Sequence, residues 1–317
     1  MPKKSGLLEF IPKTESVDYF AAAYDELSTA RDILRFAVSR FNEANLFFGH
    51  GSATAFDEAV YLILHTLHLP LDNLDPFVDA TLTRAECSKV LKIIERRVKE
   101  RIPAAYLTHE AWLGPHRFYV DANVIVPRSF IAELLQDNLN PWVASPNEVT
   151  SVLDLCTGSG CLAILAALSF PNAMVHAVDL SPAALKVAAR NINDYGLNAR
   201  IQLVESDLFT LLADRKFDVI ISNPPYVTAK SMAALPSEYL HEPKMALASG
   251  KDGLDHVRRI VEAAPEYLSD NGLLIVEAGF NREGVEQAFE GLPLTWVETS
   301  AGGEVVFLIT REELVSV

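Results

Sequence analysis

The chain has 317 residues, half of them hydrophobic, and a formal net charge of −15 at pH 7. This length favours two domains over one, and so high an apolar content excludes a globally disordered chain. A strongly acidic surface repels phosphates, which argues against a general nucleic-acid binder and favours a basic protein partner.

The N-terminal segment MPKKSGLLEFIPKTES contains lysines but no apolar run long enough for a signal peptide, and no other stretch approaches the length of a membrane span. The three cysteines are Cys87, Cys156 and Cys161. Their spacing matches neither a disulfide pattern nor a set of metal ligands, which indicates buried thiols in a reducing compartment. We therefore expect a soluble, cytoplasmic protein with no membrane partner.

The first hundred residues predict amphipathic helices. Between Asp18 and Gly51 apolar residues recur in steps of three and four, which predicts one helix with a single apolar face that ends at Gly49 and Gly51. The residues expected on that face are Phe20, Tyr24, Leu27, Leu34, Val38 and Phe41.

Two more helices are predicted before the first strand. One covers about residues 54–68, with Thr54 as a plausible cap. The next begins at Thr83, which fits a capping box with Glu86, and it is stopped by Pro103. Three amphipathic helices without a strand predict a small helical domain.

The stretch AWLGPHRFYVDANVIVPRS marks a change of structure. Gly114 and Pro115 interrupt two short runs rich in aromatic and branched residues, which predicts a β-hairpin linker at about 110–126. The expected organisation is a helical substrate-recognition domain, a hairpin linker and a catalytic domain, over residues 1–104, 105–127 and 128–317.

From Val149 onward, short apolar runs alternate with helix-length amphipathic segments. The seven runs are SVLDLC, AMVHAVDL, ARIQLVE, FDVIISN, GLLIVEA, LTWVET and VVFLIT. Strands alternating with helices predict right-handed βαβ units around a parallel sheet. The last two runs are joined only by SAGGE, which is too short for a crossover helix, so they should pair antiparallel. We therefore predict an α/β fold with a mostly parallel seven-stranded sheet and an antiparallel C-terminal hairpin.

The segment VLDLCTGSGCLAIL, residues 152–165, is an apolar strand, a glycine-rich turn and the start of a helix. Gly158 and Gly160 allow the backbone to approach a ligand where a Cβ would clash. Asp179 ends the next strand, nineteen positions after Gly160. In doubly wound sheets a carboxylate there faces the ribose hydroxyls of a bound nucleoside.

Two further acids narrow the ligand class. Asp154 precedes the glycine loop, where it could orient the loop or meet a cationic ligand, and Asp207 ends the third strand, where it could accept a bond from an adenine amino group. Three acids at successive strand ends suit S-adenosylmethionine, which has a sulfonium and an amino group but no phosphate. A dinucleotide such as NAD remains an alternative, although its pyrophosphate would prefer basic or neutral surroundings.

The stretch ISNPPYV, residues 221–227, ends the fourth strand with two prolines, which cannot donate to a sheet ladder. This end lies on the same rim of the sheet as the glycine loop. The Asn223 side-chain oxygen and the Pro224 carbonyl could accept the two N–H groups of a planar amide or aryl amine and favour the positive charge that it develops on methylation. Tyr226 would supply a ring face for the planar group.

The motifs VLDLCTGSG, AVDLS, SDLF and NPPYV, in this order, resemble the glutamine-N5 protein methyltransferases, which are related to amino-methylating DNA enzymes. The resemblance covers nearly the whole chain, including the helical domain and the hairpin. It implies a Rossmann-like class I S-adenosylmethionine-dependent methyltransferase fold and no requirement for a metal. One bacterial branch of the family methylates peptide-chain release factors, and the other methylates large-subunit ribosomal protein three.

Three stretches are similar to the ribosomal-protein branch: VPRSFIAELL, LHTLHLPLD and HEPKMALASGKDGLD. In the first, Ser129 follows Arg128 where the release-factor branch usually has proline, and Phe130 departs from the proline expected at that position. The resemblance therefore implies transfer of a methyl group to a glutamine side-chain amide in a basic ribosomal protein, before or during ribosome assembly and without direct contact to DNA.

The resemblance and the residues together define the candidate site. The candidate cofactor-binding residues are Asp154, Cys156, Thr157, Gly158, Ser159, Gly160, Asp179, Asp207, Leu208 and Asn223. The candidate catalytic residues are Asn223, Pro224 and Tyr226. The candidate substrate-binding residues are Asn223, Pro224, Pro225, Tyr226 and Arg128. Arg128 and Glu242 are expected to flank the site as supports, with a surface ion pair or loop anchor as the alternative.

Other readings of the sequence stay open. Glutamine methylation of release factors, adenine-N6 methylation of nucleic acid and an assembly factor that binds without methylating are alternative functions. His65 and His68 are more simply structural histidines than metal ligands, since no third ligand is near. The basic stretch 92–102 is typical of a solvated helix face, with contact to ribosomal RNA as the alternative. The connection 228–254 is either a lid or a structured insertion.

Overall fold

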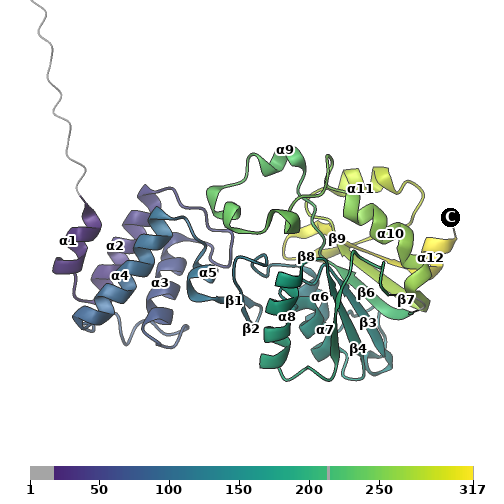
Figure 1. The fold of residues 1–317 in the computed structure, drawn as a ribbon, viewed down its shortest axis with the longest axis horizontal. Coiled ribbons are helices and arrows are strands. Elements are labelled where there is room, and N and C mark those ends of the chain that lie inside the picture. The colour runs from purple at the N-terminus through teal and green to yellow at the C-terminus, as the bar shows by residue number, and fades with distance from the viewer. Residues whose placement is uncertain (1–17, 213–214, 317) are drawn as a thin grey trace, which may run out of the picture.

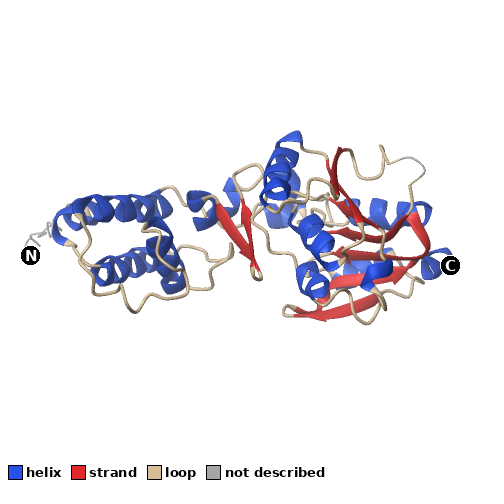
Figure 2. Cartoon of the chain, turned by 90° about the horizontal axis from the view of Figure 1, so that it is seen from below, coloured by secondary structure: helices blue, strands red, loops and turns tan. Residues whose placement is uncertain are grey.

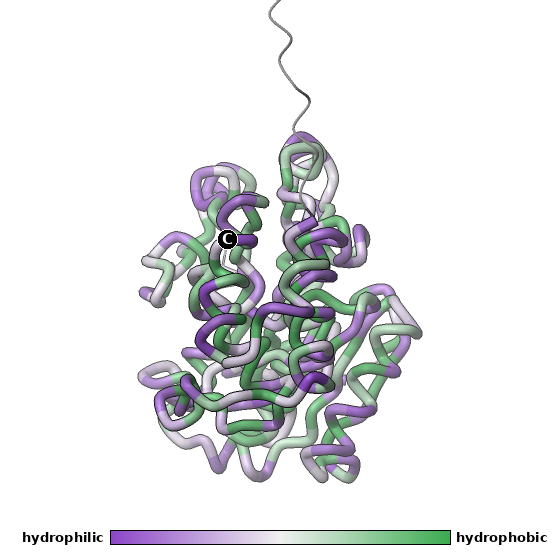
Figure 3. The backbone as a smooth tube through the Cα atoms, turned by 90° about the vertical axis from the view of Figure 1, so that its left-hand side faces the viewer, coloured by the Kyte–Doolittle hydropathy of each residue, from purple (hydrophilic) through white to green (hydrophobic). Residues whose placement is uncertain are grey.

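A computed structural model describes residues 18–212 and 215–316 of the chain. The molecule is elongated, with a group of helices at one end, a sheet covered by helices at the other, and a two-stranded hairpin between them (Figures 1 and 2). Hydrophilic segments are frequent on the outer turns and loops (Figure 3). The N-terminal stretch in which no signal peptide was expected lies outside the described residues.

The N-terminal part consists of helices that share one apolar core. They are α1 Tyr19–Glu26, α2 Ala30–Glu43, α3 Ala55–Thr66, α4 Arg84–Lys99 and the short α5 Ala104–Thr108. Thr54 caps α3, and Thr83 forms a capping box with Glu86 at the start of α4, as the sequence predicts. The core is closed by fully buried side chains such as Phe41, Leu62 and Ile94, each worth about 1.5–3 kcal/mol relative to exposure.

The prediction of one long helix up to Gly49 is wrong, because the chain breaks between Glu26 and Ala30. Thr29 accepts a hydrogen bond from the Asp32 amide, and Asp32 accepts one from the Thr29 amide. This capping box satisfies backbone groups that would otherwise be left without partners, so a new helix starts there. The second helix ends at Glu43, before either glycine.

The predicted hairpin is present but shorter than expected. Strands β1 Glu110–Leu113 and β2 His116–Tyr119 pair antiparallel around a turn. The rest of the predicted range, residues 120–126, is irregular because it packs instead of pairing. The Tyr106 hydroxyl donates to the Val124 carbonyl at 2.5 Å, and Val120, Val124 and Val126 share a small core with the helix that follows β4.

The seven predicted strands form one sheet in the order β5-β4-β3-β6-β7-β9-β8. The first five strands of this order run parallel, and β9 is antiparallel to both β7 and β8, which confirms the predicted C-terminal hairpin. The strands are β3 Ser151–Leu155, β4 Met174–Asp179, β5 Ile201–Glu205, β6 Phe217–Ser222, β7 Leu268–Glu277, β8 Thr295–Thr299 and β9 Gly302–Thr310.

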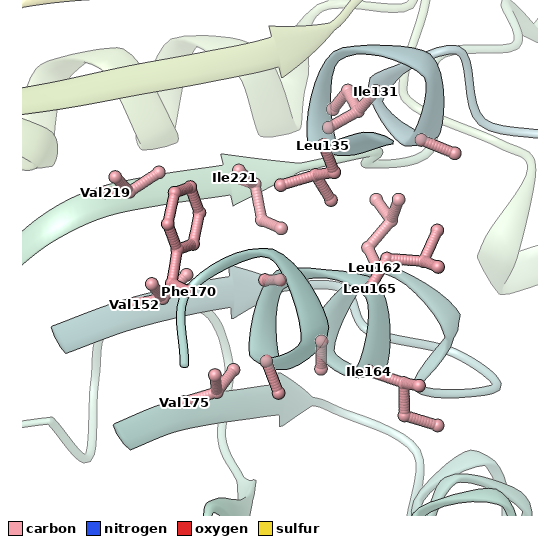
Figure 4. Packing of buried hydrophobic residues seen from close by; sticks show 14 of the residues in the cluster. Ile131, Leu135, Val152, Leu162, Ile164, Leu165, Phe170, Val175, Val219 and Ile221 are labelled. Carbon is pink, nitrogen blue, oxygen red and sulfur yellow. The ribbon is translucent and has the colours of Figure 1, made fainter. Parts of the chain in front are cut away.

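Helices cover both faces of the sheet. Because successive strand residues point to opposite faces, Val152 packs with one helical layer and Leu153 with the other. Figure 4 shows the first layer, in which Phe170 and the helical residues meet the valines of three neighbouring strands. This layer has α6 Ile131–Gln136, α7 Cys161–Ser169 and α8 Pro182–Asp194; the other has α10 Asp255–Tyr267 and α11 Arg282–Ala288, with α12 Arg311–Val315 beside β7. None of the described helices is long and apolar enough to cross a membrane.

The connection 228–254, called the strap below, is a structured insertion. It contains α9 Ala229–Met232 and two 3₁₀ turns, Ser237–His241 and Lys244–Ala246. The strap belongs to the sheet part by sequence, yet its middle is fastened to the N-terminal helices. Glu238 is fully buried and accepts a hydrogen bond from the Phe47 amide at 3.1 Å.

A buried ion cluster surrounds Glu238. Arg97 donates to Glu58 at 2.6 Å and to Glu238 at 3.3 Å, and Arg101 donates to the same Glu238 oxygen at 3.2 Å. The Arg97 side chain is only 1% exposed. The interpretation of 92–102 as a solvated basic face is therefore wrong for Arg97. A buried charge is tolerated only when it is paired and hydrogen-bonded, and this pairing joins the helices to the strap.

We predict that Glu238→Gln lowers the free energy of unfolding by about 3 kcal/mol, because it removes one charge from a buried cluster and leaves its arginine partners under-compensated. Urea unfolding followed by circular dichroism measures the change. Exposed Glu290, replaced in the same way, is the control and should shift stability by less than about 0.5 kcal/mol. Equal midpoints for the two variants would contradict a stabilising role of the cluster.

Candidate active site

The carboxyl ends of the parallel strands open into one pocket. The glycine loop follows β3, Asp179 ends β4, Asp207 follows β5 and Asn223 follows β6. The strap contributes the opposite wall. The pocket is lined by Asn123, Val124, Ile125, Cys156, Gly158, Val178, Asp179, Leu180, Ser181, Ala184, Ser206, Asp207, Leu208, Asn223, Pro225, Pro243, Met245, Ala246 and His256. The structure thus brings half of the predicted site residues into the pocket lining, from four strand ends. Among the others, Pro224, Tyr226 and Arg128 lie outside this lining.

The two glycines of the loop are required for different structural reasons. Both have positive φ angles, +54° at Gly158 and +79° at Gly160. Apart from chain neighbours, no described atom lies within 4 Å of the place where Gly158 would carry a Cβ, so its backbone faces the open pocket. A Cβ on Gly160 would stand 3.1 Å from the Cβ of Ala188, so Gly160 lets α7 approach α8 closely.

Asp154 lies beneath the loop instead of on the pocket wall. It is fully buried, accepts a hydrogen bond from the Thr157 hydroxyl at 2.5 Å, and accepts another from the Ala163 amide at 3.0 Å. Burial raises the pKa of Asp154 to about 7, although both hydrogen bonds act in the opposite direction. The geometry favours the loop-orienting role. Thr157, Ser159 and Gly160 also lie outside the pocket lining.

Asp179 is held at the pocket by backbone donors. The Gly158 amide donates to one carboxylate oxygen at 2.8 Å, and the Ser181 amide donates to the other at 2.8 Å. Burial raises the pKa of Asp179, and these amides oppose the rise. Asp179 lines the pocket, and a carboxylate oxygen can accept more than one hydrogen bond, which recognition of two neighbouring hydroxyls requires.

Asp207 is half-exposed and pairs with Arg259 of α10 at 2.9 Å. The hydrogen bond from Arg259 lowers the pKa of Asp207. The residue after it, Leu208, is buried with a φ of +51°. The His256 ring shares a hydrogen bond with the Ser249 hydroxyl at 2.8 Å. Neither Arg259 nor His256 was identified as a site residue from the sequence. Both lie at the start of a helix that follows the strap, and nothing local marks them.

The Asn-Pro-Pro-Tyr loop is held between two glycines. A Cβ on Gly253 would stand 2.3 Å from the Tyr226 carbonyl oxygen, and one on Gly279 would stand 2.7 Å from the Tyr226 ring. Asn223 and Pro225 line the pocket, and Pro224 is buried beside them. No larger residue fits at either glycine without moving the loop, so these contacts hold Tyr226 in place.

Glu277, at the end of β7, was missed by the sequence reading. It accepts hydrogen bonds from the Ser129 hydroxyl at 2.7 Å, the Phe130 amide at 2.9 Å and the Tyr226 hydroxyl at 3.3 Å. Burial raises its pKa to about 6, against these hydrogen bonds. A signal was available, since Glu277 follows a buried apolar strand in the same way as Asp179.

Arg128 and Glu242 form a bidentate pair, with distances of 2.6 Å and 2.7 Å. Glu242 is buried and also accepts from the Val126 amide at 3.0 Å, so the alternative of a surface ion pair is wrong. Burial alone would raise the pKa of Glu242, but the hydrogen bonds from Arg128 lower it to about 2. The guanidinium also lies 5.4 Å from the centre of the Tyr239 ring. This pair fastens the strap beside the pocket.

The chemistry of the pocket fits an adenosyl sulfonium ligand better than a dinucleotide. Acids at two strand ends, an open glycine backbone and apolar walls meet there, and no lysine or arginine is among the described residues that line it. A pyrophosphate would lack a cationic partner in such a pocket. Within the described residues, no group of three or more potential ligands is arranged to hold a metal ion, and His65 lies 3.7 Å from Glu110.

Comparison with known proteins shows the family to which the chain belongs. Residues 132–253 match the family model described as the methyltransferase small domain. A ribosomal protein uL3 glutamine methyltransferase of Neisseria gonorrhoeae is 60% identical over 93% of this chain and 98% of its own length. The protein of the same description from Burkholderia pseudomallei is 61% identical over 91% of this chain and 96% of its own, and that from Bradyrhizobium diazoefficiens is 50% identical over 91% and 92%. These likenesses include the N-terminal helices as well as the sheet.

We predict that Asp179→Ala weakens S-adenosylmethionine binding by about 1.5–3 kcal/mol, the range for hydrogen bonds to a charged group. Titration calorimetry measures the affinity. Asp194→Ala, which removes an exposed acid at the far end of α8, is the control and should leave it unchanged. Tight binding of NAD by the parent protein, without binding of S-adenosylmethionine, would contradict the assignment of the pocket.

We also predict that the rate of methyl transfer falls about fourfold between pH 7 and pH 5.5, because Glu277 takes up a proton with a pKa of about 6 and loses strength as the acceptor that holds Tyr226. The raised pKa means that protonation of Glu277 favours the folded state, since its unfolded pKa is near 4.5. Protonation of Glu277 is therefore not a cause of unfolding in this window.

Initial rates at saturating substrates, measured across this pH range, provide the test. Glu277→Gln should have a lower rate that is nearly independent of pH between these limits. If the variant keeps the pH dependence of the parent protein, the titrating group is another residue.

Proposed function

Because the chain belongs to the family of ribosomal protein uL3 glutamine methyltransferases, we propose that it transfers a methyl group from S-adenosylmethionine to the side-chain amide nitrogen of a glutamine in ribosomal protein uL3. The observation that carries this proposal is the high identity over nearly the whole chain, joined to an intact Asn-Pro-Pro-Tyr loop on the pocket rim. The methyl donor supplies an electrophilic methyl group on its sulfonium.

The residues that would hold the donor are those of the pocket wall. The remaining lone pairs of Asp179 accept the two ribose hydroxyls, and the backbone of Gly158 allows the donor to lie against it. Asp207, oriented by Arg259, accepts from the adenine amino group, and Leu208 packs beside the base. Asp154 holds the loop in shape from below. Pro243 and Met245 of the strap close the pocket from the other side.

The substrate amide would be oriented by the loop after β6. The Asn223 side-chain oxygen accepts one N–H of the glutamine amide, and the Pro224 carbonyl accepts the other. These acceptors draw positive charge toward the hydrogens as the nitrogen loses its planarity. The Tyr226 ring, held by Glu277 and by its contact with Gly279, covers the planar amide. In-line positioning supplies the larger share of the rate. The new N–C bond would form as the S–CH3 bond of the donor breaks, which releases S-adenosylhomocysteine, and the amide nitrogen would then lose one proton to solvent water.

Ser129 supports the ribosomal-protein branch over the release-factor branch. Its hydroxyl donates to Glu277 at 2.7 Å, which a proline at this position could not do. The residue that differs between the branches therefore contacts the carboxylate that positions Tyr226. Methylation of release factors remains the second candidate, and adenine methylation is disfavoured by the net charge of −15.

The partner is a basic ribosomal protein, which an acidic enzyme attracts. We propose that recognition precedes packing into the subunit, because a folded ribosome would cover the target glutamine. The substrate is synthesised in the cytoplasm, and the enzyme is assigned to the same compartment. The N-terminal helices and the hairpin select the substrate, because one glutamine side chain offers too little binding energy for selection.

We predict that Asn223→Ala lowers the rate constant for methyl transfer by about a thousandfold while donor affinity changes less than about twofold, since Asn223 acts on the acceptor nitrogen. Radiolabelled methyl incorporation into free uL3 measures the rate, with release factor and DNA as competing substrates. Asn198→Ala, at an exposed position before β5, is the control. Activity of the Asn223 variant within a few-fold of the parent would contradict the mechanism, and preferred labelling of DNA would contradict the function.

A further inference from the structure

A second cavity lies between the N-terminal helices and the hairpin, outside the donor pocket. We call it the hairpin groove. Its lining comes from the loop before α3, from α3 and α5, from β1 and from the segment that leads to Arg128. The lining residues include His50, Asp57, Tyr61, Glu110, Trp112 and Val126.

The groove has an apolar interior and an acidic rim, which is formed by the exposed Asp57. The other carboxylate of the lining, Glu110, is mostly buried and already paired with Arg117 at 3.5 Å. Ala104, Ala105 and Val126 are buried at its base. The Trp112 side chain is 45% exposed, and its indole N–H donates to Glu110 at 2.9 Å. Asp57 is exposed at the N-terminal turn of α3. A half-exposed tryptophan beside carboxylates favours a partner that brings both apolar and cationic side chains.

His50, which also lines the groove, lacks the partners that a buried polar group requires. It is 5% exposed, and neither ring nitrogen has a hydrogen-bond partner among the described residues. Its Nε2 atom approaches Glu242 only to 3.7 Å. Leaving a buried polar group unpaired costs about 1–3 kcal/mol. A ligand in the groove that offers a hydrogen bond to Nδ1 would remove this cost.

The groove adjoins the active site through one stretch of chain. Val126 lines the groove, whereas Val124 and Ile125 line the donor pocket. The Val126 amide donates to Glu242, the carboxylate that also holds Arg128 beside the site. The segment 124–126 is therefore a common wall of the groove and the donor pocket.

We propose that the hairpin groove binds the polypeptide segment next to the target glutamine, as an extended strand with a basic residue against Asp57 and an apolar side chain against Trp112. This inference rests on the proposed function and names the part of the enzyme that selects its protein substrate. Nucleic acid is a poor occupant, because the acidic rim repels phosphates.

Trp112→Ala tests the groove, and Trp142→Ala is a matched control. Trp142 is 37% exposed and lies between α6 and β3, outside the groove lining. Affinity for free uL3 is measured by fluorescence anisotropy without methyl donor, and KM and kcat are measured in the methylation assay. We expect Trp112→Ala to raise Kd and KM for uL3 at least about tenfold, while kcat and donor affinity stay within about twofold. The control should match the parent protein.

A second variant tests the charge. Asp57→Lys should also raise Kd for uL3, and the effect should diminish as salt screens the acidic rim. Trp112→Ala and Trp142→Ala with equal Kd and KM would overturn the groove assignment, even if the parent protein methylates uL3. Binding without methylation by the parent protein would overturn the proposed function and leave the groove supported. If the parent protein neither binds nor methylates uL3, both proposals are overturned.

Discussion

Two buried carboxylates of the strap, Glu238 and Glu242, determine how the parts of this molecule sit together. Glu238 is held by arginines from the end of α4, and Glu242 is held by Arg128 from the segment after the hairpin. Each would be costly to bury without its cationic partner. Because the strap also supplies one wall of the donor pocket, its attachment to the N-terminal helices connects those helices to the site.

Local patterns in the sequence predicted the sheet well. The seven strands, the glycine loop and the strand-ending Asn-Pro-Pro-Tyr loop depend on short-range periodicity and on residues with restricted backbones, which a single sequence displays. The break before Thr29 was missed although its capping box can be read in the sequence, because the apolar spacing continued across it. The role of Arg97 could not be read in this way, since its partner Glu238 lies 141 residues away.

The candidate site shows how one sequence pattern serves different structural roles. Asp154, Asp179 and Glu277 each lie at the end of a buried strand, yet they face different surroundings. Asp154 lies beneath the glycine loop, Asp179 lines the donor pocket, and Glu277 accepts a hydrogen bond from the Tyr226 hydroxyl. The direction in which each carboxylate side chain points depends on the pleat of its strand and on the turn that follows the strand. An acid at a strand end therefore predicts the rim of a site but not which partner it meets.

The distance in sequence between the charges of the buried cluster has a consequence during synthesis. The N-terminal helices leave the ribosome first, and domains generally begin to fold as they emerge. At that stage Arg97 has Glu58 as its only carboxylate partner from the cluster, because Glu238 has not yet been translated. The nascent helices therefore keep an incompletely neutralised surface, which is covered only when the strap arrives and closes the enzyme around its pocket.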